Sequence, residues 1–426
     1  MFTDRFTEKC RLLKDSHFTR KRKMPLTNLL LSVLFRKGRT CTMECRSFRK
    51  LFAMKTSISK PGYLKQRMKL NPDAFKMMAQ YHAEQFYKDY TAVRTYRSYL
   101  VLACDGTSLN IPTTAENLAK YGNATYKGTR ACAQIGLSCL FDVQNRVLID
   151  MCITSAKFHE RAEAVRHVDN APAITGDKPC IYLFDRGYPS GEFFLDLMER
   201  KVNFLIRLGS ASFKREQASM TSDDCILSIQ FDRTRVNSCK KETTARRLAS
   251  ARNISLRFVR IKLDNGVDEY LVTNLSHDVF STAEIGELYR LRWGIETVFD
   301  DLKNKWQIEN FSGEKPVILE QDIYATMYLS NIANDIMQDV AAEQMRKDGK
   351  PYKYPMQLNR NIAIGILKED LIHVFLERRP RKKYALMESI MHDIESNLLP
   401  IRPDRHFKRP TGLFAGKYSN VRKRCF

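Results

Sequence analysis

Residues 99–108 read YLVLACDGTS, and residues 180–188 read CIYLFDRGY. Each stretch is a short apolar run typical of a buried β-strand, and an aspartate and a glycine turn follow it. The two aspartates, Asp105 and Asp185, are therefore predicted at the carboxyl ends of two strands, where α/β sheets bind their ligands. A single aspartate in such a place is more often a turn former or a helix cap, so further residues are needed to establish a site.

The pattern around these two strands predicts an α/β fold. Further apolar or alternating runs predict strands over 132–141, 146–154 and 202–208, and a turn at 142–145 joins the first two of them as a hairpin. Helices are expected over 159–168 and 190–201. Three strands in a meander, followed by strands that alternate with helices, is the order of a ribonuclease-H-like fold.

A third carboxylate lies in the segment IGELYRLRWGIETVFDDLKNKW, residues 285–306. On a single helix, Tyr289, Arg292, Glu296 and Lys303 fall on one edge within roughly 60°. The apolar residues of the segment form the neighbouring stripe, which would pack on a core. The alternative is an amphipathic surface helix with ion pairs. Glu296 and the two strand-end aspartates together make a constellation that favours a catalytic site.

These motifs resemble the DDE transposases of bacterial insertion sequences, in the insertion-sequence-four-like group marked by Tyr-x2-Arg-x3-Glu-x6-Lys. The resemblance extends over residues 26–313 and implies a ribonuclease-H-like fold with a β-rich insertion before the glutamate helix. It also implies that Asp105, Asp185 and Glu296 are catalytic. Tyr289 and Arg292 would hold DNA phosphates near the cleaved end, and Lys303 would add a charge contact there.

The chemistry of three carboxylates predicts a two-metal site. They can hold two divalent ions that activate the attacking oxygen and stabilise the leaving oxygen at phosphorus. Magnesium suits such oxygen ligands, and manganese is expected to substitute.

Four further residues are weaker candidates for this site. Trp293 is expected to stack on an unstacked base or to be a partly buried anchor. Asp300 is a rival ligand expected to be a solvated acid. His159 and Glu160, which open a helix, are more often capping or packing residues than catalysts.

The charge distribution points to a polyanionic partner. The chain carries 71 Lys and Arg against 48 Asp and Glu, a formal charge of +23. Residues 1–98 hold 23 basic and 7 acidic side chains, and residues 377–426 hold 13 and 5, so the middle of the chain is close to neutral. Such asymmetry is typical of basic flanks that bind a phosphate backbone around a neutral catalytic core.

The predicted organisation has four parts. Residues 1–97 form a helical DNA-binding domain, or a helical subdomain that only packs on the core. Residues 98–209 and 275–323 form the catalytic core, and 210–274 form a β-rich insertion with strands over 225–231, 254–263 and 269–273 and a turn at 264–266. Residues 240–247 are expected to form a loop. Residues 324–426 form a helical and basic region that serves DNA contact or dimerisation.

The predicted function is that of a transposase that binds the inverted-repeat ends of its element, cuts them and joins them to target DNA. Because two ends must be paired, a homodimer is expected. No segment is apolar enough to span a membrane, which favours a cytoplasmic, nucleoid-associated protein. The alternatives are a catalytically silent DNA-binding protein derived from a transposase and a structure-specific nuclease of the same fold.

Overall fold

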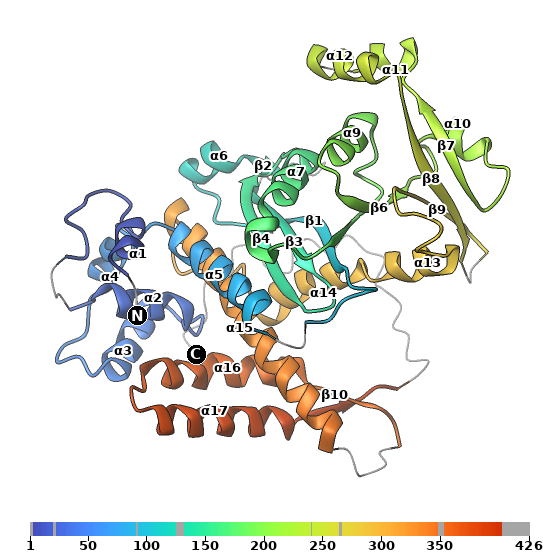
Figure 1. The fold of residues 1–426 in the computed structure, drawn as a ribbon. Helices are drawn as coiled ribbons and strands as arrows, with labels where there is room; N and C mark the ends of the chain where they lie inside the picture. The colour runs from blue at the N-terminus through green and yellow to red at the C-terminus, as the bar shows by residue number, and fades with distance from the viewer. Residues whose placement is uncertain are drawn as a thin grey trace.

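A mixed β-sheet forms the centre of the molecule (Figure 1). The structure is a computed structural model that describes residues 3–19, 23–90, 93–124, 132–239, 241–263, 266–347 and 353–402. Its strands are β1 (Leu100–Asn110), β2 (Asn123–Ala124), β3 (Cys132–Asp142), β4 (Val147–Ser155), β5 (Cys180–Phe184), β6 (Asn203–Leu208), β7 (Asp224–Gln230), β8 (Asn253–Lys262) and β9 (Asp268–Thr273).

The strand order confirms the predicted ribonuclease-H-like fold. Strands β4, β3, β1, β5 and β6 are neighbours in that order, and the short β2 pairs with the start of β3. β3 runs antiparallel to both β4 and β1, whereas β1, β5 and β6 are parallel. The β3–β4 hairpin is the predicted one, and its turn forms because the Asp142 carboxylate accepts hydrogen bonds from the backbone N–H groups of Gln144 and Asn145.

The insertion continues the central sheet. β9 pairs antiparallel with β6, and β8 and β7 follow, so the predicted insertion strands are confirmed and extend one edge of the core sheet. Three short helices accompany them, namely α10 (Lys214–Ala218), α11 (Arg233–Asn237) and α12 (Glu242–Ala251).

The loop expected over 240–247 is wrong for residues 242–247, which lie in α12. The helix is held because Leu248 is buried and Arg247 forms ion pairs with Asp196 and Glu199. Residue 240 and residues 264–265 of the predicted turn lie outside the described residues.

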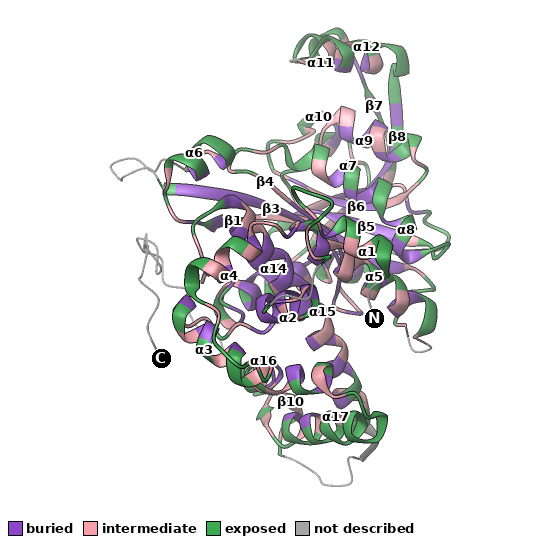
Figure 2. Ribbon diagram, turned by 90° about the vertical axis from the view of Figure 1, so that its left-hand side faces the viewer, coloured by how far each residue is buried: buried purple, intermediate pink, exposed green. Residues whose placement is uncertain are grey.

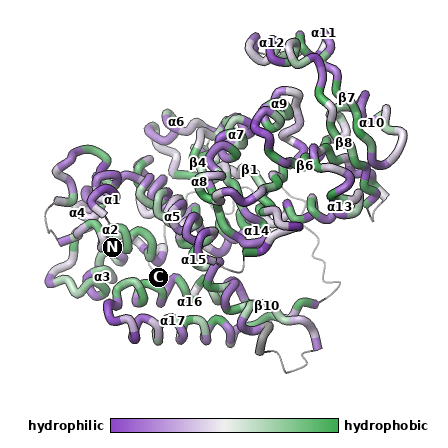
Figure 3. The backbone as a smooth tube through the Cα atoms, viewed as in Figure 1, coloured by the Kyte–Doolittle hydropathy of each residue, from purple (hydrophilic) through white to green (hydrophobic). Residues whose placement is uncertain are grey.

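Helices cover both faces of the sheet. On β1, Val101 and Ala103 face one hydrophobic core, while Leu102 and Cys104 face another, as the alternation of a strand requires. The second core includes α7 (Glu160–Asn170) and α9 (Gly191–Glu199), and the first includes α14 (Trp293–Asp300) and the long α15 (Pro316–Lys347). Figure 2 shows the central strands largely buried, and Figure 3 shows that the strands and α2 carry mainly hydrophobic residues.

The N-terminal region consists of helices that share a core with α15. They are α1 (Asp4–Lys9), α2 (Leu26–Leu34), α3 (Cys41–Leu51), α4 (Lys60–Arg67) and α5 (Asp73–Asp89). The Arg67 guanidinium, fully buried, forms an ion pair with Asp322 of α15 at 2.9 Å and donates to Gln321 at 2.8 Å. These helices therefore pack on the core that contains α15, and their DNA-binding role stays a prediction.

The remaining elements complete the core and the C-terminal region. α6 (Ala115–Tyr121), α8 (Pro172–Thr175) and α13 (Thr282–Arg290) belong to the core. β10 (Met356–Leu358), α16 (Arg360–Leu376), α17 (Pro380–Glu395) and β11 (Leu398–Pro400) follow α15. The boundary predicted between residues 323 and 324 falls inside α15, so it divides a single helix. Among the described helices, none is long and apolar enough to cross a membrane.

Candidate active site

Asp105 and Asp185 lie side by side on neighbouring strands. The parallel pairing of β1 with β5 runs from Leu100 opposite Cys180 to Ala103 opposite Leu183, and the same offset continued brings position 105 opposite position 185. Asp185 follows β5 as predicted. Asp105 does not end β1, which continues to Asn110 because its pairing with β3 extends beyond the end of β5. Asp105 instead lies where β1 loses β5 as its neighbour, and this opens space beside it.

Backbone groups and charges fix the ionisation of Asp105. Its Oδ1 accepts a hydrogen bond from the N–H of Gly106 at 2.8 Å, and the Oδ1 of Asp185 accepts one from Gly187 at 2.8 Å. Burial is the largest cause that raises the pKa of Asp105, and the carboxylates of Asp185 and Glu160 add to it. The Gly106 N–H and the Arg292 guanidinium oppose the rise, and the pKa that results is about 6. Two adjacent carboxylates with this mutual repulsion are suited to share a cation.

The segment that bears Glu296 is not the single regular α-helix that the signature predicted, because a tightened turn interrupts its hydrogen-bond pattern at Leu291 and Arg292, although both residues keep helical backbone angles. α13 ends at Arg290, α14 begins at Trp293, and residues 301–305 form a π-helical turn. At this turn, the N–H groups of Leu291, Arg292 and Ile295 bond carbonyls three residues earlier, which tightens the chain. Arg292 lies inward at this turn and is 5% exposed.

Arg292 connects Glu296 to Asp105. Its Nη2 lies 2.8 Å from Oε1 of Glu296, and its Nη1 lies 3.8 Å from Oδ2 of Asp105. α14 packs on the sheet face toward which Asp105 points, as the inclusion of Ile295 and Val298 in that core requires. A single guanidinium, that of Arg292, therefore lies between the carboxylates of Glu296 and Asp105.

The other residues of the signature lie around this group at different depths. Tyr289 is 2% exposed and lies under Arg292, whose guanidinium is 5.8 Å from the tyrosine ring centre. Trp293 is 47% exposed, and its ring lies 5.4 Å from the same guanidinium. The Lys303 Nζ donates to the Thr107 hydroxyl at 2.6 Å, on the face of β1 that carries Asp105. The spacing of the signature placed all four residues on the edge beside the apolar stripe that packs on the core, but Tyr289 and Arg292 are themselves buried.

Two buried polar atoms here have no hydrogen-bond partner within the described part of the chain. They are the Tyr289 hydroxyl and the Arg292 Nε. Buried donors without a partner are costly, so a bound anionic group would stabilise both.

Three of the weaker candidates, Asp300, His159 and Glu160, lie in different surroundings. Asp300 is exposed and accepts a hydrogen bond from Asn304 at 2.6 Å, as expected of a solvated acid. His159 occupies the N-cap position of α7 without a side-chain capping bond. Glu160 instead lies at the strand ends beside Asp185, whose charge raises the pKa of Glu160 together with burial. Its position after the third strand, in Phe158-His-Glu, was the sequence signal for it.

The donor set fits a divalent metal ion, although it is not gathered around one point. The oxygen ligands are hard, and Asp105 and Asp185 repel each other. Among the described residues, no group of three His, Cys, Asp or Glu side chains is already arranged as a metal site. The physical reason is that the Arg292 guanidinium, rather than an ion, lies between Asp105 and Glu296.

The raised pKa of Asp105 predicts a change in stability with pH. A carboxyl that binds its proton more tightly in the folded state stabilises the fold below its unfolded pKa of 3.8, and this contribution is lost as the pH rises through about 6. In the metal-free protein, Asp105→Asn should therefore be more stable than the wild type at pH 7, by up to about 3 kcal/mol, and the difference should shrink toward pH 4. Urea unfolding of both proteins between pH 4 and 7 measures this difference. The same difference in free energy of unfolding at every pH would contradict the prediction.

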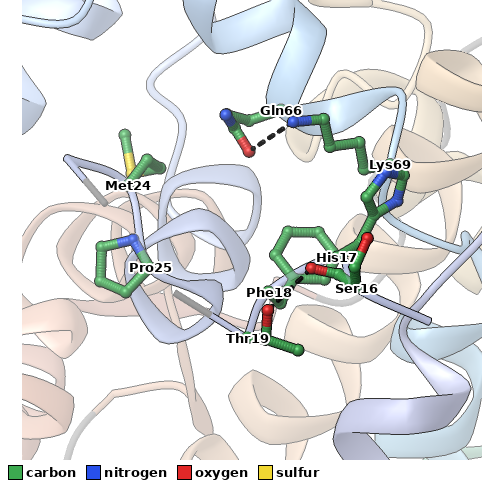
Figure 4. A pocket seen from close by; sticks show the side chains of 8 residues that line it. All are labelled: Ser16, His17, Phe18, Thr19, Met24, Pro25, Gln66 and Lys69. Atoms are coloured by element: carbon green, nitrogen blue, oxygen red, sulfur yellow. Dashed lines mark hydrogen bonds between the residues drawn. The ribbon is translucent and has the colours of Figure 1, made fainter. Parts of the chain in front are cut away.

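A cavity elsewhere in the molecule is separate from the carboxylates. It measures about 340 Å³ and is lined by Ser16, His17, Phe18, Thr19, Met24, Pro25, Gln66 and Lys69 (Figure 4). All eight residues belong to the N-terminal region, and none is acidic, so this cavity does not contribute to the carboxylate site.

The ribonuclease-H-like sheet and the acidic side chains near its strand ends agree with the class of DDE transposases. The transposase DDE domain family matches residues 96–332. The chain belongs to this family of transposases, which act with divalent metal ions, and the predicted membership is confirmed.

The chain is also similar to individual transposases. The chain is 23% identical over 333 residues to transposase InsG of insertion sequence element IS4 from Escherichia coli strain K12, covering 76% of this chain and 70% of InsG. It is 31% identical over 68 residues to the transposase of IS421 from Escherichia coli, which is 16% of this chain and 18% of that protein. A solved piggyBac transposase chain, from a synaptic complex with hairpin DNA, aligns at TM-score 0.44 and 10% identity over 92% of this chain and 83% of that one.

Proposed function

We propose that this transposase binds the inverted-repeat ends of an insertion sequence, cleaves them and transfers the freed strands to target DNA. The observation that carries the proposal is the convergence of three carboxylates. Asp105 and Asp185 continue one strand register, and Arg292 joins Asp105 to Glu296. Carboxylates from two strands and a helix that one guanidinium and one strand register hold near one another suit metal-dependent displacement at phosphorus, once Arg292 is released.

Asp105, Asp185 and Glu296 would hold two Mg²⁺ ions, with Mn²⁺ as a substitute. When bound, the ions supply activation of the attacking water or 3′-hydroxyl and neutralise charge on the phosphate. For Glu296 to join the aspartates, its contact with Arg292 must be exchanged. The partner that releases Arg292 would be a DNA phosphate, which guanidinium groups bind through two parallel hydrogen bonds.

The signature residues would contact the DNA near the cleaved end. Arg292 and Tyr289 carry the two unpartnered buried atoms and would bind one phosphate. Lys303, now bonded to Thr107, would bind another phosphate beside Asp105. Trp293 is exposed next to Arg292, which suits stacking on an unpaired base.

Duplex binding would involve the basic ends of the chain. On α3, Arg46, Arg49 and Lys50 are exposed on one face, because the opposite face of the helix is buried. On α17, Arg381, Lys382 and Lys383 are exposed in the first turns. Both helices lie at the same end of the molecule (Figure 1). The basic residues 403–426 lie outside the described residues.

Pairing of two ends implies a homodimer, and bacterial DNA as substrate implies a cytoplasmic, nucleoid-associated location.

One experiment separates this function from its alternatives. Purified full-length protein is incubated with DNA that carries the flanking ends of its gene and with a target plasmid, with and without Mg²⁺. We expect metal-dependent cleavage and joined products. Cleavage without joining would favour a structure-specific nuclease, and binding without cleavage would favour a catalytically silent DNA-binding protein.

A further inference from the structure

Glu160 is a fourth acidic side chain at the carboxylate site. It is the first residue of α7, which covers the sheet face opposite to α14. A Cβ atom placed on Gly106 would lie 3.6 Å from Glu160 Oε1, and one placed on Gly187 would lie 3.7 Å from its Oε2. These glycines adjoin Asp105 and Asp185, so the Glu160 carboxylate lies across both strand ends.

Two contacts hold the start of α7 in this position. The Phe158 ring packs directly on the glycines of β1 and β3, where a Cβ on Gly106 would lie 2.8 Å from the ring and one on Gly136 would lie 2.6 Å from it. Only glycine leaves room for that ring. On the other side, the Arg161 Nη2 donates to the Gly187 carbonyl at 3.1 Å. Glu160 thus lies between two anchored residues. Phe158 packs on β1 and β3, and Arg161 is bonded to Gly187, which follows β5.

The Glu160 carboxylate forms no direct hydrogen bond or ion pair among the described residues, and the one cation that acts on it is its neighbour Arg161. A Cβ on Gly187 would lie within 4 Å of both Glu160 Oε2 and Asp185 Oδ1, so these two acidic oxygens are near neighbours. No hydrogen bond or ion pair of the Glu160 side chain is present within that part of the chain, whereas Glu163 and Asp169 on the same helix each pair with an arginine. An exposed acid that lies beside two others and forms no direct ion pair is suited to a divalent cation.

We propose that Glu160 is a metal-binding residue that acts with Asp185 at the DNA cleavage site. The proposal rests on the proposed two-metal function. It assigns carboxylates to both faces of the sheet, with Glu160 arriving from the α7 side and Glu296 from the α14 side. Because Arg292 contacts both Glu296 and Asp105, Glu160 and Asp185 are the two acids of the site, among the described residues, that form no ion pair before DNA binds.

The test is Mn²⁺ binding by the full-length protein without DNA, measured by electron paramagnetic resonance of the free ion. Glu160→Gln should weaken Mn²⁺ binding by about tenfold or more. Glu160→Asp, which keeps the charge but shortens its reach, should give an intermediate affinity. The matched control is Glu242→Gln, because Glu242 is also the exposed first residue of a helix, α12, and its loss changes the net charge equally.

The possible outcomes distinguish this inference from the proposed function. If the wild type binds Mn²⁺ and Asp185→Asn weakens the binding while Glu160→Gln does not, the role of Glu160 is overturned and the proposed function stands. If the wild type does not bind Mn²⁺ even with DNA ends present, both are overturned. Circular dichroism of each variant establishes that a lost affinity comes from the site, since Glu160 is exposed and its replacement should leave the fold intact.

Discussion

Asp105→Asn, Asp185→Asn and Glu296→Gln are each expected to reduce DNA cleavage by about 10³-fold or more, because metal stabilisation of the transition state contributes several kcal/mol. Each change keeps the size of the side chain and removes only its charge. DNA affinity should remain close to that of the wild type, since no contact to phosphate is lost and the net positive charge rises. Gel assays of cleavage and fluorescence anisotropy of labelled end DNA measure the two effects separately.

The control for this prediction lies one turn after Glu296. Asp300 is an acid of the same helix that is exposed and bonded to Asn304, so Asp300→Asn should leave cleavage unchanged. A Glu296→Gln variant that cleaves at the wild-type rate would contradict the assignment of the third carboxylate to α14. Equal loss of binding and cleavage would indicate damage to the fold.

The core of the fold was predictable because its signals are local. The apolar strand before Asp185 and the β3–β4 hairpin follow from runs of five to eleven residues and from Asp142 in its turn. The side-by-side placement of Asp105 and Asp185 followed from the usual position of ligands at strand ends. The insertion strands were also predictable, since the alternation of apolar and polar residues is a local pattern that does not depend on which strand is the neighbour.

Features that depend on tertiary contacts were not predictable. The helical spacing of Tyr289, Arg292 and Glu296 fits one regular helix, whereas the tightened turn at Leu291 and Arg292 accompanies the contact of Arg292 with Asp105, which is distant in sequence. Glu160 resembled an ordinary first-turn acid, because its neighbours Gly106 and Gly187 are distant in sequence. α12 was missed because its short amphipathic pattern is stabilised by ion pairs to α9.

Removing residues 1–95 is expected to unfold the catalytic core, because the N-terminal helices and α15 share one hydrophobic interior. Phe75 and Leu29 are completely buried in it, and the deletion would also leave the buried Asp322 without Arg67. Breaking such a buried pair costs about 3–5 kcal/mol, a large part of the stability of most domains. Arg67→Ala alone should therefore lower the free energy of unfolding by about this amount, measured by urea denaturation.

A surface variant separates this structural role from DNA binding. Arg46→Ala, Arg49→Ala and Lys50→Ala combined should change stability by little, because all three side chains are exposed on α3. If α3 contacts the duplex, this variant loses affinity for end DNA. The slope of log affinity against log salt concentration should then become shallower by the amount expected for roughly two to three phosphate contacts. A fragment of residues 96–426 that folds with wild-type stability would show that the N-terminal helices form an independent unit, which the burial of Arg67 against α15 argues against.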